Sequence, residues 1–175
     1  MVRFVIRESR REDLDELWRI DQACFPPEIS YSRLELSVYM RRSGSFTLVA
    51  EPASTEGEQP LPVSGIAAPR IVGFIVAEAN RRGLGHIITI DVLETARRCG
   101  LGSELLRSAE NRLRAAGCDN VVLETAVDNV AALAFYKRHH YFLTKTVPRY
   151  YSNGVDAFLL KKDLRPSAVP ANVQA

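Results

Sequence analysis

Short runs of apolar residues recur along almost the whole chain, and their spacing alternates between that of strands and that of helices. Runs rich in β-branched and aromatic residues predict seven strands, at 2–7, 45–51, 70–80, 87–93, 120–125, 141–147 and 155–160. Apolar residues at helical spacing predict four helices, between Ser9 and Phe25, from Ser32 to Tyr39, at 101–116 and at 131–139.

Polar residues mark where several of these elements begin and end. Ser9 with Glu12, and Ser32 with Glu35, have the spacing of capping boxes, which place the starts of the first two helices. The prolines after Phe25 end the first helix, and the segment 81–85 is predicted to be a turn before the fourth strand.

Length and composition indicate one globular domain over 1–164. The segment 52–69 is rich in Pro, Ala, Ser, Gly and Glu without periodicity, so we interpret it as a flexible inserted loop, and 165–175 as a disordered tail. A net charge of +2 gives no reason to expect nucleic acid or a membrane as partner. Three cysteines without metal-like spacing, and no signal-peptide or membrane-spanning run, predict a cytoplasmic protein without a metal site.

The stretch from the fourth strand to the next helix carries the first candidate chemistry. The strand 87–93 leads through Arg97-Arg98-Cys99-Gly100-Leu101-Gly102-Ser103 into a helix. The unpaired N–H groups of a helix start favour a phosphate group, and the glycines allow close approach. Neither a P-loop nor a dinucleotide fingerprint fits these residues. Cys99 is considered as a nucleophile because it lies at a helix start, but the sequence shows no His, Asp or Asn partner, so packing beside a cofactor is the preferred interpretation.

Two separated motifs together resemble one family. Arg97-x-x-Gly100-x-Gly102 is similar to motif A of the GCN5-related N-acetyltransferases (GNAT). Leu123-Glu124, Asn129 and Phe135-Tyr136, followed by Arg149-Tyr150-Tyr151 and Asp156-Ala157, resemble the ribosomal-protein-alanine and related N-terminal acetyltransferases. The resemblance covers roughly 87–164, with a looser match at Cys24-Phe25-Pro26.

The chain departs from this family at several positions. His140 stands where the family usually has a glycine of positive φ, a conformation that we expect to cost His about 1 kcal/mol. Glu94 and Ala96 replace the usual proline and aromatic residue before the basic loop. These changes leave the implied chemistry intact and weaken the assignment to one subfamily.

The resemblance implies an α/β fold with a central mixed, mostly antiparallel sheet of about seven strands, flanked by helices, in which strands four and five splay apart. Acetyl-CoA would lie in the gap. The residues implied to bind it are Ile90, Asp91 and Val92 on strand four, Arg97, Arg98, Cys99, Gly100, Leu101, Gly102 and Ser103 in the loop and helix start, and Asn129, Ala132 and Tyr136 beyond strand five.

The resemblance also implies catalytic roles for two residues. Glu124 would act as general base, through water, and Tyr136 would give a proton to the departing CoA thiolate. Taken singly, each residue is better explained by an ordinary role, Glu124 as a solvated strand carboxylate and Tyr136 as a half-buried helix aromatic. Phe25, Tyr31, Tyr150 and Tyr151 are candidates for the acceptor entrance, although Tyr150 and Tyr151 equally fit a cap of the hairpin.

Three functions remain open from the sequence. The first is acetylation of the N-terminal α-amine of a protein or peptide, the second is acetylation of a lysine or small amine on the same fold, and the third is acyl-CoA binding without catalysis. Glu124 and Tyr136 favour the two enzymes over the binding module. The sequence leaves the oligomeric state open.

Overall fold

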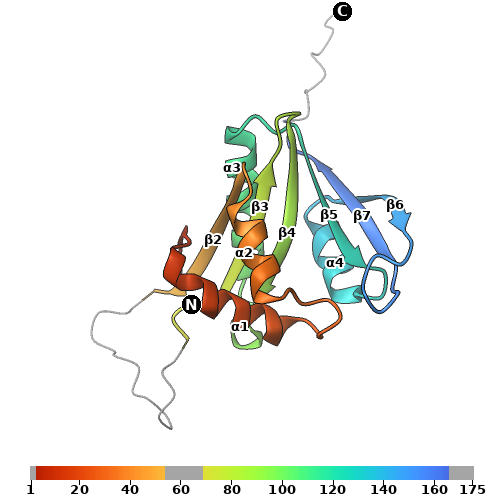
Figure 1. Ribbon diagram of the computed structural model, residues 1–175. Helices are drawn as coiled ribbons and strands as arrows, with labels where there is room; N and C mark the ends of the chain where they lie inside the picture. The colour runs from red at the N-terminus through yellow and green to blue at the C-terminus, as the bar shows by residue number, and fades with distance from the viewer. Residues whose placement is uncertain (1–2, 54–68, 166–175) are drawn as a thin grey trace, which may run out of the picture.

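The computed structural model describes residues 3–53 and 69–165 and contains one mixed sheet with helices on both faces (Figure 1). The predicted loop 52–69 and tail 165–175 fall largely outside these residues. The elements, in chain order, are β1 (Phe4–Glu8), η1 (Arg11–Asp13), α1 (Leu14–Cys24), α2 (Arg33–Arg41), β2 (Ser45–Pro52), β3 (Gly73–Ala79), β4 (Leu84–Val92), η3 (Glu94–Ala96), α3 (Leu101–Ala115), β5 (Asn120–Ala126), α4 (Val130–Arg138), β6 (Phe142–Val147) and β7 (Ala157–Asp163).

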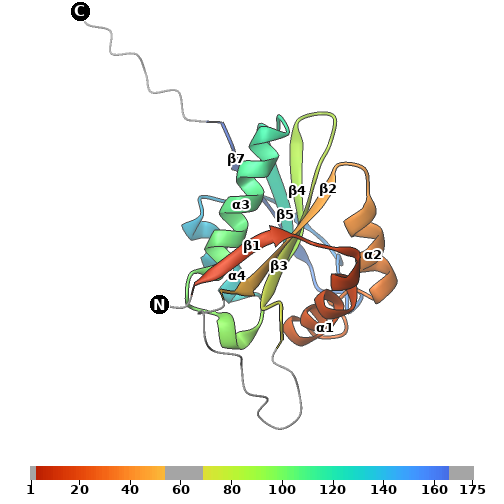
Figure 2. The same cartoon turned by 90° about the vertical axis from the view of Figure 1, so that its left-hand side faces the viewer.

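The seven strands lie in the order β1-β2-β3-β4-β5-β7-β6, as predicted for a mixed, mostly antiparallel sheet. Only β4 and β5 are parallel among the neighbouring pairs of the described sheet. Helices α1 and α2 cover one face, and α3 and α4 cover the other (Figure 2). Because side chains alternate along a strand, Phe74 of β3 packs under α1 and α2, while Ile75 packs under α3.

The predicted splay of the fourth and fifth strands is confirmed. β4 and β5 pair at three positions only, ending at His86 opposite Val122, and then diverge. Near this fork, the register of β3 against β4 shifts so that Val76 faces Thr89 and Ala77 faces Ile87, which makes Ile88 the extra residue of a β-bulge. The fork opens a gap in the middle of the sheet (Figure 1).

β4 begins earlier than predicted. Leu84 and Gly85, expected in a turn, already pair with Asn120 and Val121 of β5. A Cβ on Gly85 would lie 2.7 Å from the Leu113 side chain of α3, so close packing of the helix, and not a turn, accounts for this glycine. The prediction for His140 is confirmed, because its φ is 65° after α4.

The first capping box was predicted incorrectly, whereas the second is confirmed. Ser32 Oγ accepts a hydrogen bond from the Glu35 N–H at 3.2 Å, and Glu35 accepts one from the Ser32 N–H at 2.8 Å. At the first helix, however, Asp13 and not Glu12 accepts from the backbone, at 2.7 Å from the Arg10 nitrogen. Arg7 from β1 and Arg70, which is distant in sequence, hold the Asp13 carboxylate there.

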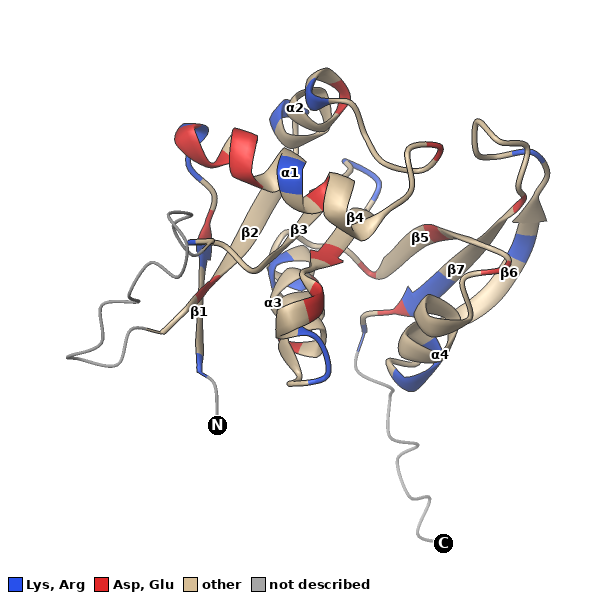
Figure 3. Ribbon diagram, turned by 90° about the horizontal axis from the view of Figure 1, so that it is seen from below, with Lys and Arg blue, Asp and Glu red and all other residues tan. Residues whose placement is uncertain are grey.

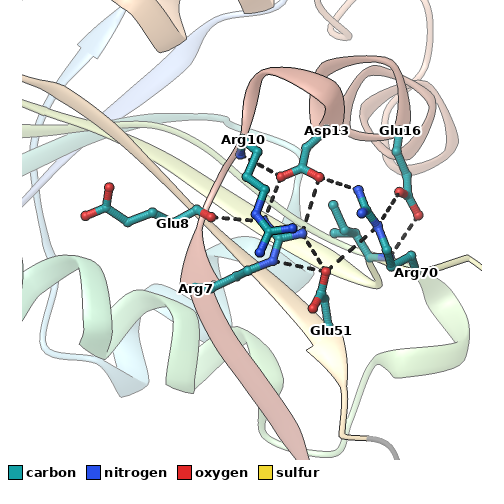
Figure 4. Close-up of polar contacts among 8 residues, drawn as sticks. Arg7, Glu8, Arg10, Asp13, Glu16, Glu51 and Arg70 are labelled. Carbon is teal, nitrogen blue, oxygen red and sulfur yellow. Dashed lines mark hydrogen bonds and ion pairs between the residues drawn. The ribbon is translucent and has the colours of Figure 1, made fainter.

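Those partners form an ion cluster around the buried Asp13 carboxylate, where β1, β2 and η1 meet the start of β3 (Figure 4). Asp13 is fully buried and lies 2.7 Å from Arg7 and 2.5 Å from Arg70, while Arg7 also bonds Glu51. Burial alone would raise the pKa of Asp13, but the hydrogen bonds and charges of these partners outweigh it and hold the pKa below 3.8.

We expect Asp13→Asn to lower the free energy of unfolding by about 2 kcal/mol at pH 7, because it leaves Arg7 partly uncompensated. The stabilisation that goes with a depressed native pKa is fully present above the pKa of the unfolded state. It is lost as the pH falls through the pKa of the native state. The difference from the parent, measured by urea unfolding, should therefore shrink below pH 3.8. The exposed Asp15, 2.6 Å from Arg33, gives the control. Asp15→Asn should cost less than about 0.5 kcal/mol, and an equal loss in both variants would contradict a special role of the cluster.

Charged residues are distributed unevenly among the elements (Figure 3). Acidic residues are frequent in η1 and α1, whereas Lys and Arg occur along β6 and β7 and at the end of α4. Among the residues that the structure describes, no helix is long and apolar enough to cross a membrane.

Candidate active site

A cleft of about 970 Å³ opens at the fork between β4 and β5. Its walls come from the segment after α1, from β4, from the loop into α3, from β5 and α4, and from the β6–β7 connection. Fifteen predicted site residues line it: Phe25, Tyr31, Ile90, Val92, Arg97, Arg98, Gly100, Gly102, Ser103, Glu124, Asn129, Ala132, Tyr136, Tyr150 and Tyr151. The structure thus brings together most residues of two distant motifs.

Three predicted cofactor residues do not line the cleft. Asp91 is 1% exposed, its carboxylate accepts a hydrogen bond from Thr89 Oγ1 at 3.2 Å, and burial raises its pKa. The thiol of Cys99 turns toward the Ala96 carbonyl at 2.8 Å, and Leu101 packs in the core. A contribution of their backbone groups to binding stays a prediction.

One end of the cleft is suited to phosphate. Gly100 takes a φ of 91° immediately before α3, so the chain turns its N–H groups outward at the positive end of the helix. Arg97 is fixed by a hydrogen bond of 2.8 Å from its Nε to the Val92 carbonyl, and Arg98 and Arg138 add further charge to the wall. The Ser103 hydroxyl lies 2.9 Å from Nε2 of His139, a contact that the sequence analysis missed.

Tyr136 lines the cleft from α4. Its ring is 6% exposed and packs edge-on against Phe135 and Tyr141, at centroid distances of 5.2 and 5.5 Å. Burial, followed by the charge of Asp91, raises the Tyr136 pKa, which keeps the phenol neutral. The phenol is therefore protonated at physiological pH, and its role as a proton donor stays a prediction. Asn129 caps α4, since its side chain accepts from the Ala132 N–H at 3.1 Å.

Glu124 has an unpredicted partner in His86. Nε2 of His86 lies 2.7 Å from Oε2 of Glu124, across the point where β4 and β5 separate. Burial would lower the pKa of His86, but the hydrogen bond and charge of Glu124, with Glu78, outweigh it and raise the pKa above 6.5. The prediction missed His86 because it placed this residue next to a turn. Extending the strand by two residues would have put His86 on the face of the sheet toward the fork.

Aromatic side chains line the other end of the cleft. The Tyr31 hydroxyl donates to the carbonyl of Ile88, the bulge residue, at 3.4 Å. Tyr150 and Tyr151 pack edge-on at 5.0 Å, and burial, with the charge of Glu124, raises the pKa of each to about 12. Ser152 Oγ donates to the Glu28 carbonyl at 2.8 Å and joins the two loops that border this end. Both tyrosines therefore border the cleft as well as close the hairpin.

Comparisons with known proteins agree on one family. The family model of the acetyltransferase (GNAT) family matches residues 14–141. The N-alpha-acetyltransferase of Sulfolobus acidocaldarius is 30% identical over 93% of this chain and 94% of that protein. The uncharacterized N-acetyltransferase MJ1530 of Methanocaldococcus jannaschii is 41% identical over 57% of this chain, a match that spans 63% of that protein. The crystal structure of Ard1 from Thermoplasma volcanium superposes with a TM-score of 0.76, at 25% identity, covering 93% of this chain and 99% of that one.

Proposed function

The chain belongs to the acetyltransferase (GNAT) family, and we propose that it transfers the acetyl group of acetyl-CoA to the N-terminal α-amine of a protein or peptide. One observation carries the proposal: a single cleft holds a phosphate-suited helix start, a neutral phenol and a carboxylate bonded to an imidazole. The similarity to the Sulfolobus N-alpha-acetyltransferase, which extends over nearly the full length of both chains, favours an α-amine as acceptor.

The residues of the cleft fit acetyl-CoA, which supplies the acetyl thioester. The N–H groups at the start of α3, with Arg97, Arg98 and Arg138, would hold the pyrophosphate and neutralise its charge. Gly102 leaves the approach to these groups open. The exposed edges of β4 beyond His86 would bind the pantetheine amides, because β5 no longer pairs with β4 there.

Acetyl transfer forms a bond from the amine nitrogen to the acetyl carbon and breaks the bond from that carbon to sulfur. A protonated acceptor loses two protons overall. We assign uptake of the first, which frees the amine lone pair, to the Glu124–His86 pair. The Tyr136 hydroxyl can donate a proton to the leaving thiolate, and the second proton, released as the amide forms, restores the phenol. No hydrogen bond ties that hydroxyl to any residue in the described part of the chain.

The lower pKa of an α-amine, compared with that of a lysine, favours an α-amine as the acceptor. A terminal amine titrates at about 7.7–8.0 and a lysine at about 10.4, so the α-amine is far more often neutral at pH 7. One carboxylate–imidazole pair therefore suffices as a base for an α-amine.

An initial-rate screen with acetyl-CoA tests the proposal. Peptides with a free N-terminus should be acetylated, whereas the same peptides blocked at the N-terminus but containing lysine, and small amines such as spermidine, should react at least about tenfold more slowly, given their amine pKa values. Faster reaction of the blocked peptides or of the small amines would identify the protein as a lysine or small-amine acetyltransferase. Binding of CoA without turnover of any acceptor would identify it as an acyl-CoA-binding module.

We expect Glu124→Gln to lower kcat by about tenfold at pH 7, because it removes the base while preserving the size of the side chain. Raising the pH should restore much of the loss as the acceptor deprotonates unaided. The measurement is kcat against pH on one peptide, with the exposed Glu12→Gln as control for the change in charge. A loss that stays constant from pH 7 to pH 9 would contradict the role of Glu124 as a base.

A further inference from the structure

Three neighbouring strands place ionisable side chains in a row across one face of the sheet. Glu78 on β3 and His86 on β4 are directly opposite in the antiparallel register, so both side chains point to the same face. Oε1 of Glu78 lies 3.8 Å from Nδ1 of His86, and Glu124 of β5 lies 2.7 Å from Nε2. The two ring nitrogens of one histidine thus face two different carboxylates.

The outer end of this row is anchored from α2. Nη1 of Arg42, the residue that ends the helix, lies 3.8 Å from Oε2 of Glu78. The same guanidinium stacks 4.1 Å above the centre of the Tyr39 ring, which holds it over the sheet. Glu78 does not line the cleft, whereas Glu124 does. The row Arg42–Glu78–His86–Glu124 therefore connects the protein surface with the fork.

We propose that Glu78, oriented by Arg42, is a positioning residue that holds the His86 ring with Nε2 toward Glu124 and stabilises the imidazolium that forms when this pair takes up the proton of the acceptor. The proposal rests on the proposed function for the role of the pair. Nothing in it requires Glu78 to contact a substrate.

Elementary electrostatics explains how Glu78 acts through His86. A partner on one ring nitrogen determines which nitrogen carries the proton and how the ring is turned. The charged groups that face His86 are Glu124 from β5 and Glu78 from β3, with Arg42 of α2 behind Glu78. With both carboxylates present, the neutral ring binds a proton more tightly, because the imidazolium that results faces two negative charges. Removing Glu78 weakens that preference and frees the ring to rotate away from Glu124.

The test is the NMR titration of the His86 imidazole in the parent and in Glu78→Gln. The chain has three histidines, so His86→Gln assigns the signal. We expect the titration midpoint to fall by about half a pH unit or more in Glu78→Gln, because a carboxylate 3.8 Å from Nδ1 stabilises the charged imidazolium. Glu12→Gln, which makes the same change in charge on an exposed part of η1, should leave the midpoint unchanged.

A second readout comes from kcat against pH. Glu78→Gln should lower the plateau by about threefold or more and move the acid limb to lower pH, in the same direction as the titration. A purely structural role would lower the plateau or the melting temperature without moving the His86 midpoint. Glu78→Asp keeps the charge but places it farther from the ring, so its His86 midpoint should lie between those of the parent and Glu78→Gln. This variant provides the test if Glu78→Gln does not fold.

Two failures are distinguishable. An unchanged His86 midpoint in Glu78→Gln, equal to that of Glu12→Gln, would overturn the role of Glu78 whatever the activity. Absence of acetyl transfer by the parent protein would overturn the proposed function but leave the titration readable.

Discussion

Replacing Tyr136 by phenylalanine is expected to lower kcat by about 100-fold, while the affinity for acetyl-CoA stays within about twofold of the parent. The substitution keeps the ring, which packs against Phe135 and Tyr141, and removes only the hydroxyl. The raised pKa keeps that hydroxyl protonated, and it makes no hydrogen bond to the described residues that would have to be broken before it donates. Single-turnover kinetics and calorimetric titration with acetyl-CoA separate the two effects.

Tyr141→Phe is the matched control for this variant. It removes the same group from an adjacent ring, but the Tyr141 hydroxyl donates to Glu110 at 3.0 Å in the interior and faces away from the chemistry. We expect it to cost about 1 kcal/mol of stability and to leave kcat within about threefold. Parent-like turnover of Tyr136→Phe, or an equal loss in both variants, would remove Tyr136 as the proton donor.

Gly102→Glu is expected to abolish measurable binding of acetyl-CoA and with it all turnover. Gly102 is the second residue of α3 and lies in the cleft wall at the phosphate-suited end. A glutamate there would place a carboxylate among the groups that bind the pyrophosphate, where like charges repel each other. The fold should survive, because an acidic residue in the first turn of a helix is favourable.

Gly102→Ala separates the effect of the added negative charge on acetyl-CoA binding from the effect of the added side-chain volume. A Cβ at this position would lie 3.5 Å from the Phe135 ring, which is an ordinary contact, so we expect the alanine variant to bind acetyl-CoA within about tenfold of the parent. Calorimetry on both variants, with circular dichroism to verify folding, makes the comparison. Undiminished binding by Gly102→Glu would place the cofactor elsewhere.

The local features of this fold could be predicted from the sequence because local chemistry determines them. The apolar stripe of α3, which ends at Leu113, is buried as its spacing indicates. The cap of Ser32 on Glu35 and the positive φ of His140 were likewise evident from residue type and spacing. The fork itself followed from the family resemblance and not from any periodicity.

Features that depend on tertiary contacts could not be predicted in this way. At the start of the first helix, Asp13 is held by Arg7 and by Arg70, and Arg70 reaches it from far along the chain. Gly85 looked like a turn residue because a sequence does not show Leu113 packing against it. Because the fourth strand was predicted to begin at residue 87, His86 was left outside the sheet, and its contact with Glu124 was not predicted.

The most direct test of the proposed activity is a single peptide that offers both kinds of amine. A synthetic peptide with a free N-terminus and one internal lysine is incubated with the protein and acetyl-CoA, and fragmentation mass spectrometry locates the acetyl group. The Tyr136→Phe variant serves as the background. We expect the acetyl group on the α-amine, with little on lysine and about 100-fold less product from the variant. Acetylation mainly on the lysine, or equal product from both proteins, would contradict the account.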